Sequence, residues 1–175
     1  MAADTTYRPK VYKRSGGDKI TVASGGEIEV EAGGLLNMGG PVAAGSALTV
    51  TRLLHHGRII ALDTAAGSTC TLPAATGTGS RFTFIVTVTP TSNAHVVAAY
   101  TTDIMAGLAL GLDDDGVPAN AWGTASDTDK VSMNSSTTGG EIGDMVECVD
   151  ILTGVWAVQV RLTQSGTEAT PFAAT

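Results

Sequence analysis

The chain has 175 residues, a net charge of −7 and 43% hydrophobic residues, which is enough for a packed core and argues against a disordered chain. Thr, Val and Ile together account for 49 residues, whereas Lys, Glu and Gln account for only 12. Because β-branched residues fit pleated sheets and lose side-chain freedom in helices, this composition argues against an all-helical protein.

Residues 1–19 are polar and basic, and Pro9 disfavours a helix just before it, so we expect an extended arm. The arm has a net charge of +3, whereas the rest of the chain has −10. An acidic body repels a phosphate backbone, so we expect no direct binding of nucleic acid. The basic arm either meets an acidic partner surface or is simply a solvated terminal segment.

Residues 20–47 hold a short repeat and a hinge. Ile20 and Val22, and then Ile28 and Val30, alternate with other residues and precede a Gly-Gly pair. The alternation predicts short strands, and the glycine pairs suit tight turns. Strands this short cannot bury a core alone, so they either stack, within one chain or between copies, or form a single loose hairpin. The small residues 41–47 predict a hinge.

Residues 48–165 predict the main body. Apolar residues alternate with Thr or polar residues most clearly in 82–89 and 156–162. Weaker strands are predicted near 48–54, 57–63, 68–72, 94–100, 104–110, 130–134 and 145–152. Many short strands separated by turn residues indicate an all-β fold with a β-sandwich, jelly-roll-like or barrel body.

The alternation also predicts a core and a tail. We expect six residues of the two clearest strands to be buried on facing sheets: Phe82, Phe84, Val86, Trp156, Val158 and Val160. Residues 166–175 are small and predict a loosely packed C-terminal tail.

The histidines and cysteines do not form a recognisable site in the sequence. His55 and His56 are adjacent, so on a regular strand they point to opposite faces and cannot chelate one ion. His95 stands alone, and we assign all three histidines structural or surface roles. Cys70 and Cys148 are too few and too far apart for a disulfide framework or a metal knuckle, and their apolar or Thr neighbours predict buried thiols.

One acidic run is a candidate calcium site. Asp113 to Asp115 are followed by Gly116, which suits a tight loop of oxygen ligands. Asp127 and Asp129 could join this site only if the fold brings them close. The ligand spacing of an EF-hand is missing, so the preferred interpretation is a solvated acidic turn.

Catalytic patterns are missing from the sequence. Ser and Thr are abundant, but no base stands in a recognisable frame and there is no nucleophile-elbow sequence. The run Gly77-Thr-Gly79-Ser80 resembles a fragment of a phosphate loop but lacks its Lys and full spacing. Spacing cannot select a catalytic pair among the 17 acids. We therefore predict a protein that is not an enzyme and needs no cofactor.

The first residues lack the pattern of a signal peptide, and no apolar run reaches the length that spans a bilayer. We therefore expect assembly in a cytoplasm and no membrane partner.

Several stretches resemble structural proteins of tailed bacteriophages. They are residues 71–84 (TLPAATGTGSRFTF), 89–95 (TPTSNAH), 154–158 (GVWAV), 166–172 (GTEATPF) and the glycine-punctuated opening 22–34, and together they span about half of the chain. In this order along the chain they are similar to capsid decoration (cement) proteins. They are also similar to some head- or tail-fibre proteins, so a fibre or receptor-binding protein is the alternative.

The resemblance implies a virion structural protein on the capsid surface, where it stabilises the shell by binding the major capsid protein. Decoration proteins of this kind are commonly trimers at three-fold positions, so the resemblance implies a homotrimer. We expect the arm to carry the capsid contact, because Tyr and Arg are enriched at binding hot spots and three arms bind more strongly than one. The predicted contact residues are Tyr7, Arg8, Lys10, Tyr12, Lys13 and Arg14.

Overall fold

The computed structural model describes residues 11–13, 20–22, 25–30, 32–35, 37, 39–114 and 119–175. The chain divides into two compact units, Met1–Asn37 and Met38–Thr175. In the first unit, β1 (Val11–Lys13) pairs antiparallel with β2 (Ile20–Val22).

Only one of the two alternating segments in the predicted repeat is a strand. Ile20–Val22 forms β2, but its partner is β1 in the predicted arm, and residues 26–30 are not in a strand. The physical reason lies in the sequence of the second segment. Glu27, Glu29 and Glu31 would place three like charges on one face of a strand, which disfavours pairing.

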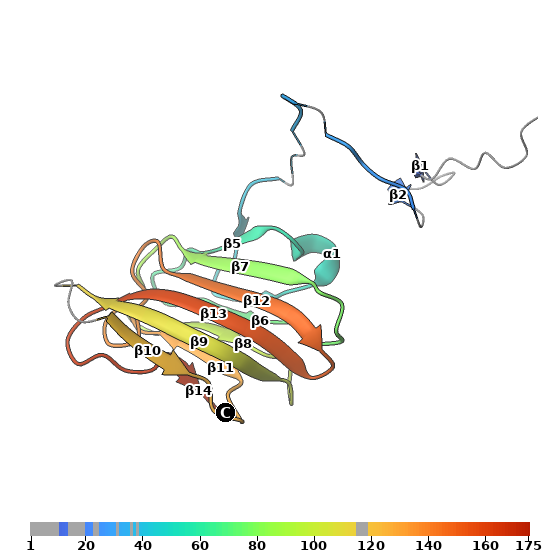
Figure 1. Ribbon diagram of the computed structural model, residues 1–175. Coiled ribbons are helices and arrows are strands. Elements are labelled where there is room, and N and C mark those ends of the chain that lie inside the picture. The colour runs from blue at the N-terminus through green and yellow to red at the C-terminus, as the bar shows by residue number, and fades with distance from the viewer. Residues whose placement is uncertain are drawn as a thin grey trace, which may run out of the picture. The chain divides into compact units, whose positions relative to one another are not determined.

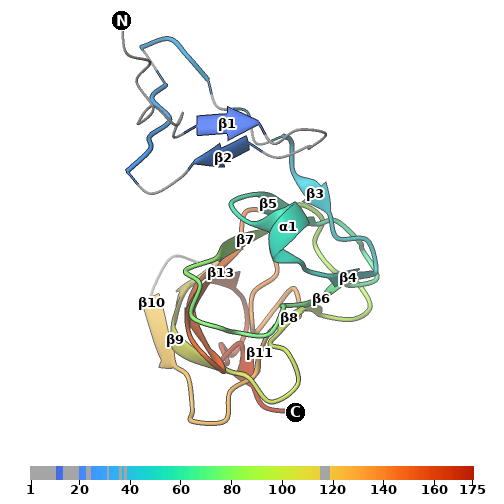
Figure 2. The ribbon, with the colours of Figure 1, turned by 90° about the vertical axis from the view of Figure 1, so that its right-hand side faces the viewer.

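The second unit is a sandwich of two mixed sheets, which confirms the all-β prediction (Figure 1). In the seven-stranded sheet the order is β10-β9-β13-β12-β7-β5-β3, and in the five-stranded sheet it is β14-β11-β8-β6-β4. Figure 2 shows the two layers from the edge. The strands of the larger sheet are β3 (Val42–Ala43), β5 (Ile59–Leu62), β7 (Arg81–Val86), β9 (Ile104–Asp113), β10 (Ala119–Gly123), β12 (Met145–Leu152) and β13 (Val155–Gln164). Those of the smaller sheet are β4 (Ala47–Thr49), β6 (Thr69–Thr71), β8 (His95–Ala98), β11 (Lys130–Met133) and β14 (Phe172–Ala173).

From β3 to β8 the chain alternates between the two sheets. As a result, β3, β5 and β7 lie parallel in one sheet, and β4, β6 and β8 lie parallel in the other. Later in the chain, β12 and β13 form an antiparallel hairpin that turns at Gly154, whose φ is 77°. β9 then pairs with β13 in parallel over ten residue pairs. Strands that are neighbours in a sheet are therefore mostly distant in sequence.

The inward side chains of both sheets form one hydrophobic core. The six predicted core residues are each at most 1% exposed, which confirms their burial: Phe82, Phe84, Val86, Trp156, Val158 and Val160. Their predicted placement on facing sheets is wrong, because β7 and β13 belong to the same sheet with β12 between them. The ring centroids of Phe82 and Trp156 lie 5.7 Å apart. A period of two in the sequence determines which side chains point inward, but not which sheet a strand joins.

Three segments differ from the sequence expectation. The predicted hinge 41–47 contains β3 and the start of β4, and Ala44 within it is buried. The predicted loose tail 166–175 contains β14, where the ring of Phe172 reaches the core and the backbone pairs with β11. The predicted strand 48–54 stops at Thr49 and is followed by α1 (Arg52–His55). No helix in the described part of the chain is long and apolar enough to cross a membrane.

Candidate functional site

The predicted capsid-binding residues all belong to the first unit. Tyr12 and Lys13 lie in β1. The other four lie outside the described residues: Tyr7, Arg8, Lys10 and Arg14. The capsid contact of the arm therefore stays a prediction.

The adjacent histidines were expected on a strand, but they lie at the end of α1. His55 is buried, and its Nδ1 accepts the backbone N–H of Thr51 at 2.8 Å. His56 is exposed, and its Nδ1 accepts the backbone N–H of Arg81 at 3.2 Å. The His55 ring therefore binds the residue just before α1, and the His56 ring joins the end of α1 to β7.

His95 is fully buried on β8 and uses both ring nitrogens. Its Nδ1 accepts the backbone N–H of Ser68 at 2.9 Å, and its Nε2 lies 2.8 Å from the carbonyl oxygen of Val88. Because one partner can only donate and the other can only accept, the ring is neutral with its proton on Nε2. This agrees with the predicted structural role.

The acidic run begins at the end of β9. Asp113 is the last residue of that strand and Asp114 follows it, whereas the other residues of the run lie outside the described part. Asp129 is engaged elsewhere, since its carboxylate accepts the backbone N–H of Thr175 at 3.1 Å and also the Thr175 hydroxyl. Among the described residues, no group of three or more His, Cys, Asp or Glu side chains could hold a metal ion. Calcium binding at this run stays a hypothesis.

The carboxylate of Asp150 on β12 is fully buried and makes an ion pair and several hydrogen bonds. Its Oδ2 lies 2.7 Å from Nη2 of Arg52 on α1, in an ion pair. Its Oδ1 accepts the backbone N–H groups of Thr76 and Gly77 at 2.9 and 2.7 Å. Oδ2 also accepts the backbone N–H of Thr78 at 3.2 Å and the Thr78 hydroxyl at 2.7 Å. We call this arrangement the Asp150 clasp.

The clasp includes Gly77 and Thr78, which belong to the run that resembles a fragment of a phosphate loop. Burial alone would raise the pKa of Asp150, but hydrogen bonds from Thr78, Arg52 and Gly77 outweigh it and hold this pKa well below its usual range. Gly77 has a φ of 74°, which suits glycine and turns the chain around the carboxylate. The backbone N–H groups of this loop therefore surround an anion, but the anion is a side chain of the same protein.

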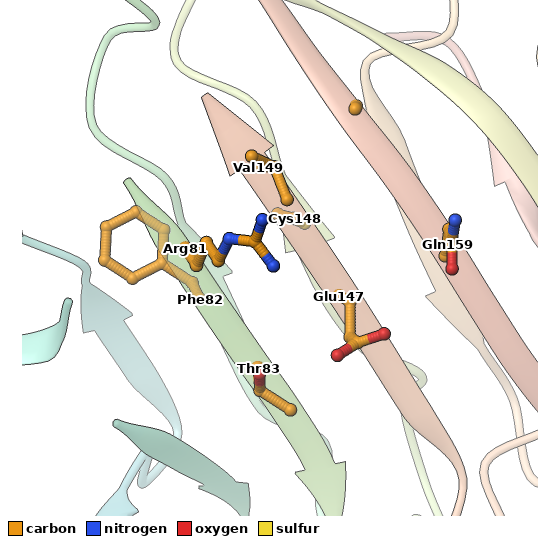
Figure 3. Close-up of a pocket in the computed structure, with 8 residues that line it drawn as sticks. Arg81, Phe82, Thr83, Glu147, Cys148, Val149 and Gln159 are labelled. Atoms are coloured by element: carbon orange, nitrogen blue, oxygen red, sulfur yellow. The ribbon is translucent and has the colours of Figure 1, made fainter. Parts of the chain in front are cut away.

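The outer face of the seven-stranded sheet has a shallow hollow of about 260 Å³ over β7, β12 and β13 (Figure 3). The lining residues are Arg81, Phe82, Thr83, Glu147, Cys148, Val149, Ala157 and Gln159. In Figure 3 the guanidinium of Arg81 extends from β7 towards β12. Glu147 is paired with Arg161 at 3.6 Å, and their side chains are 42% and 63% exposed.

Polar side chains and the apolar side chains of Val149 and Ala157, which are paired on adjacent strands, line the hollow together. The sequence predicted no functional site at the residues that line this hollow.

No protein-family model matches this chain, and neither does any curated protein or solved structure.

Proposed function

We propose that this protein is a structural protein of a tailed bacteriophage, which binds the outside of the capsid as a homotrimer and stabilises it as a decoration protein. Its partner is the major capsid protein. The proposal takes its starting point from the resemblance to decoration proteins described above. The structural observation that carries it is the division of the chain, which puts the basic arm and the acidic sandwich in different compact units.

The first unit suits attachment to another protein. A two-stranded sheet leaves one unpaired edge on each strand, and such a hairpin is only marginally stable alone. A strand of a coat subunit that pairs with this edge would complete the sheet and supply backbone hydrogen bonds with little demand on sequence. The positive charge of residues 1–19 would add attraction to an acidic coat surface.

The second unit is suited to be the stable body of a decoration protein. The core joins both sheets, and the Asp150 clasp ties α1 and the loop 74–78 to β12. A decoration protein needs a stable fold and an adhesive surface rather than turnover of a substrate. Three arms held by one trimer would bind the shell far more strongly than a single arm.

The test removes residues 1–19 and measures how much of the truncated protein binds undecorated, expanded capsids of the phage that encodes it. We expect the truncated protein to stay folded, keep the mass of a trimer and lose capsid occupancy. A variant with Arg8, Lys10, Lys13 and Arg14 all changed to Gln should also bind less at low salt. Arg81→Gln on the sandwich is the matched control and should bind normally.

Near-normal occupancy by the truncated protein would refute the arm as the anchor. If neither the full chain nor its variants bind capsids, the decoration function itself is refuted. Counting copies in purified virions separates the alternative, because a decoration protein covers every capsid face whereas a fibre protein is present in few copies.

A further inference from the structure

The charges of the second unit are unevenly divided along the chain. Residues 38–98 hold three basic residues and one acidic residue, a net charge of +2, whereas residues 99–175 hold two basic and eleven acidic residues, a net charge of −9. The first stretch contains β3 to β8 and the second contains β9 to β14. We call these stretches the N-terminal and C-terminal halves of the sandwich. The net negative charge of the sandwich comes from its C-terminal half.

The topology keeps the two halves apart in space. In the seven-stranded sheet, β7, β5 and β3 lead to one edge, whereas β12, β13, β9 and β10 lead to the other. In the five-stranded sheet, β8, β6 and β4 lead to one edge, whereas β11 and β14 form the other. Because only residues 44–46 join β3 to β4, these two edges lie on the same side of the sandwich (Figure 2). The sandwich therefore has a weakly basic side and a strongly acidic side.

On the basic side, α1 and the residues after it form an exposed corner. Leu53 and Leu54 of α1 are 92% and 59% exposed, and His56 is also exposed. The guanidinium of Arg58 donates to backbone oxygens, with Nη2 2.7 Å from the oxygen of Gly40 and Nη1 3.4 Å from that of Leu54. Among the described residues it has no carboxylate partner. We call Leu53, Leu54, His56 and Arg58 the α1 corner.

The α1 corner carries positive charge without a nearby free acid. Residues 38–62 contain no Asp or Glu. Asp150, which the fold brings to α1, is fully buried and paired with Arg52, so it adds no free negative charge. Arg81 lies outside the corner, because its guanidinium extends towards β12 (Figure 3). Exposed leucines supply apolar contact and a guanidinium pairs with carboxylates, so the corner is suited to an acidic protein surface.

The chain enters the sandwich at this corner. The second unit begins at Met38, and the oxygen of Gly40, two residues later, accepts the hydrogen bond from Arg58. Residues 1–19, with a net charge of +3, are the other basic part of the protein. An acidic partner surface would attract both the arm and the α1 corner, and it would repel the C-terminal half of the sandwich. Charge therefore favours a single orientation of the sandwich on such a surface.

We infer that the α1 corner is the part of the sandwich that contacts the capsid, against an acidic surface of the major capsid protein, and that the C-terminal half points away from the shell. This inference rests on the proposed function. It adds to the arm a second contact and an orientation of the body.

Thiol protection tests the orientation. The native Cys70 and Cys148 are fully buried and free. Burial, with a smaller effect of the negative charge of Asp63, raises the pKa of the Cys70 thiol to about 12, and burial raises the pKa of Cys148 as well. Neither native thiol should therefore react in the folded protein. Leu53→Cys adds one accessible thiol at the α1 corner.

A maleimide should modify Leu53→Cys readily in the free protein and at least about tenfold more slowly on undecorated, expanded capsids, because an interface excludes solvent. Leu110→Cys is the matched control, since Leu110 on β9 is 53% exposed and belongs to the C-terminal half. It should react at the same rate in both states. Circular dichroism checks that each variant is folded. If folded Leu53→Cys fails to bind capsids while Leu110→Cys binds, the loss itself supports the corner as the contact.

A second experiment tests the charge of the partner surface. Leu53→Glu should bind capsids about fivefold less tightly than Leu53→Gln at low salt, and the difference should shrink at high salt. The same pair of substitutions at Leu110 should show no difference. Equal binding of Leu53→Glu and Leu53→Gln would overturn the acidic partner surface.

The outcomes separate this inference from the proposed function. If the wild type binds capsids but the Leu53→Cys thiol reacts equally in the free and bound states, the inference is overturned and the decoration function stands. Protection of Leu110→Cys on capsids would mean that the C-terminal half faces the shell, which also overturns the inference. Protection of Leu53→Cys already in the free protein would place the corner between copies of the chain, with the same consequence. A wild type that binds no capsids refutes the decoration function, and the inference falls with it.

Discussion

Replacing Asp150 with Asn should destabilise the sandwich strongly although the two side chains have nearly the same shape. The Oδ2 position accepts hydrogen bonds from Arg52 and from both the N–H and the hydroxyl of Thr78. An amide NH₂ at this position can accept none of them. If the amide turns over, its NH₂ group faces the N–H groups of Thr76 and Gly77 instead. In either orientation the NH₂ group of the amide faces N–H or O–H donors of its neighbours, and the charge of Arg52 is left unpaired.

Removing one partner of a buried ion pair costs about 3–5 kcal/mol. Because the Asp150 side chain is fully buried but the Arg52 side chain is 30% exposed, we expect Asp150→Asn to lose about 3 kcal/mol of its free energy of unfolding, the lower end of this range. For a unit of this size, the loss corresponds to a fall in melting temperature of roughly 10–15 °C. Urea unfolding at neutral pH, followed by Trp fluorescence and circular dichroism, measures the free energy, and a thermal scan measures the melting temperature.

Glu147→Gln is the matched control, because Glu147 lies on the same strand and also pairs with an arginine. The two charged groups of that pair lie 3.6 Å apart and both are open to solvent, so its loss should cost less than about 1 kcal/mol. A loss of less than about 1 kcal/mol for Asp150→Asn would refute the reasoning, because the carboxylate would then not be the group that holds the clasp together.

Two further predictions concern acid and the core. Because the folded-state pKa of Asp150 lies below its unfolded value of about 3.9, the stability that this group contributes is complete above that pH and is lost as the pH falls below it. The urea concentration at the unfolding midpoint of the wild type should therefore decrease when the pH is lowered below about 4. The decrease should be smaller in Asp150→Asn, and equal decreases would contradict this assignment. Burial raises the pKa of Asp144, against hydrogen bonds from backbone N–H groups, so its contribution has the opposite sign and fades as the pH rises through its folded-state pKa. Phe84→Ala and Trp156→Ala should each cost about 3–5 kcal/mol in urea unfolding at neutral pH, since both side chains are fully buried, and a loss below about 1 kcal/mol would mean that the core is not packed around them.

The sequence allowed the strands with strong alternation to be predicted, because alternation reflects burial on one side of a sheet. β7 and β13 were found in this way, and their apolar residues are buried. The partners of these strands could not be predicted, because alternation carries no information on which strand lies alongside. β10 was missed because Ala and Gly residues show no hydrophobic alternation. β14 was missed because its contact with the core depends on the single aromatic ring of Phe172 among small residues.

The Asp150 clasp was also not predicted, although one signal is present in the sequence. On β12 the inward positions are Val146, Cys148 and Asp150, so a carboxylate follows two apolar residues on the buried side. An acid at such a position indicates a buried partner. Its partner Arg52 lies 98 residues earlier, and nothing local to either residue relates the two. The arm, in contrast, was chosen from composition alone, and its role stays a prediction.

The alternation of β3 to β8 between the two sheets has a consequence for folding. Each parallel pair in this region joins two strands that are separated in the chain by a strand of the other sheet. A pair can therefore form only after the chain has passed through the opposite layer and returned. Closing such loops costs conformational entropy before any hydrogen bond between the strands is gained, which slows folding. Because neither layer can be assembled from a continuous segment, this half of the sandwich should acquire and lose both sheets in a single cooperative step.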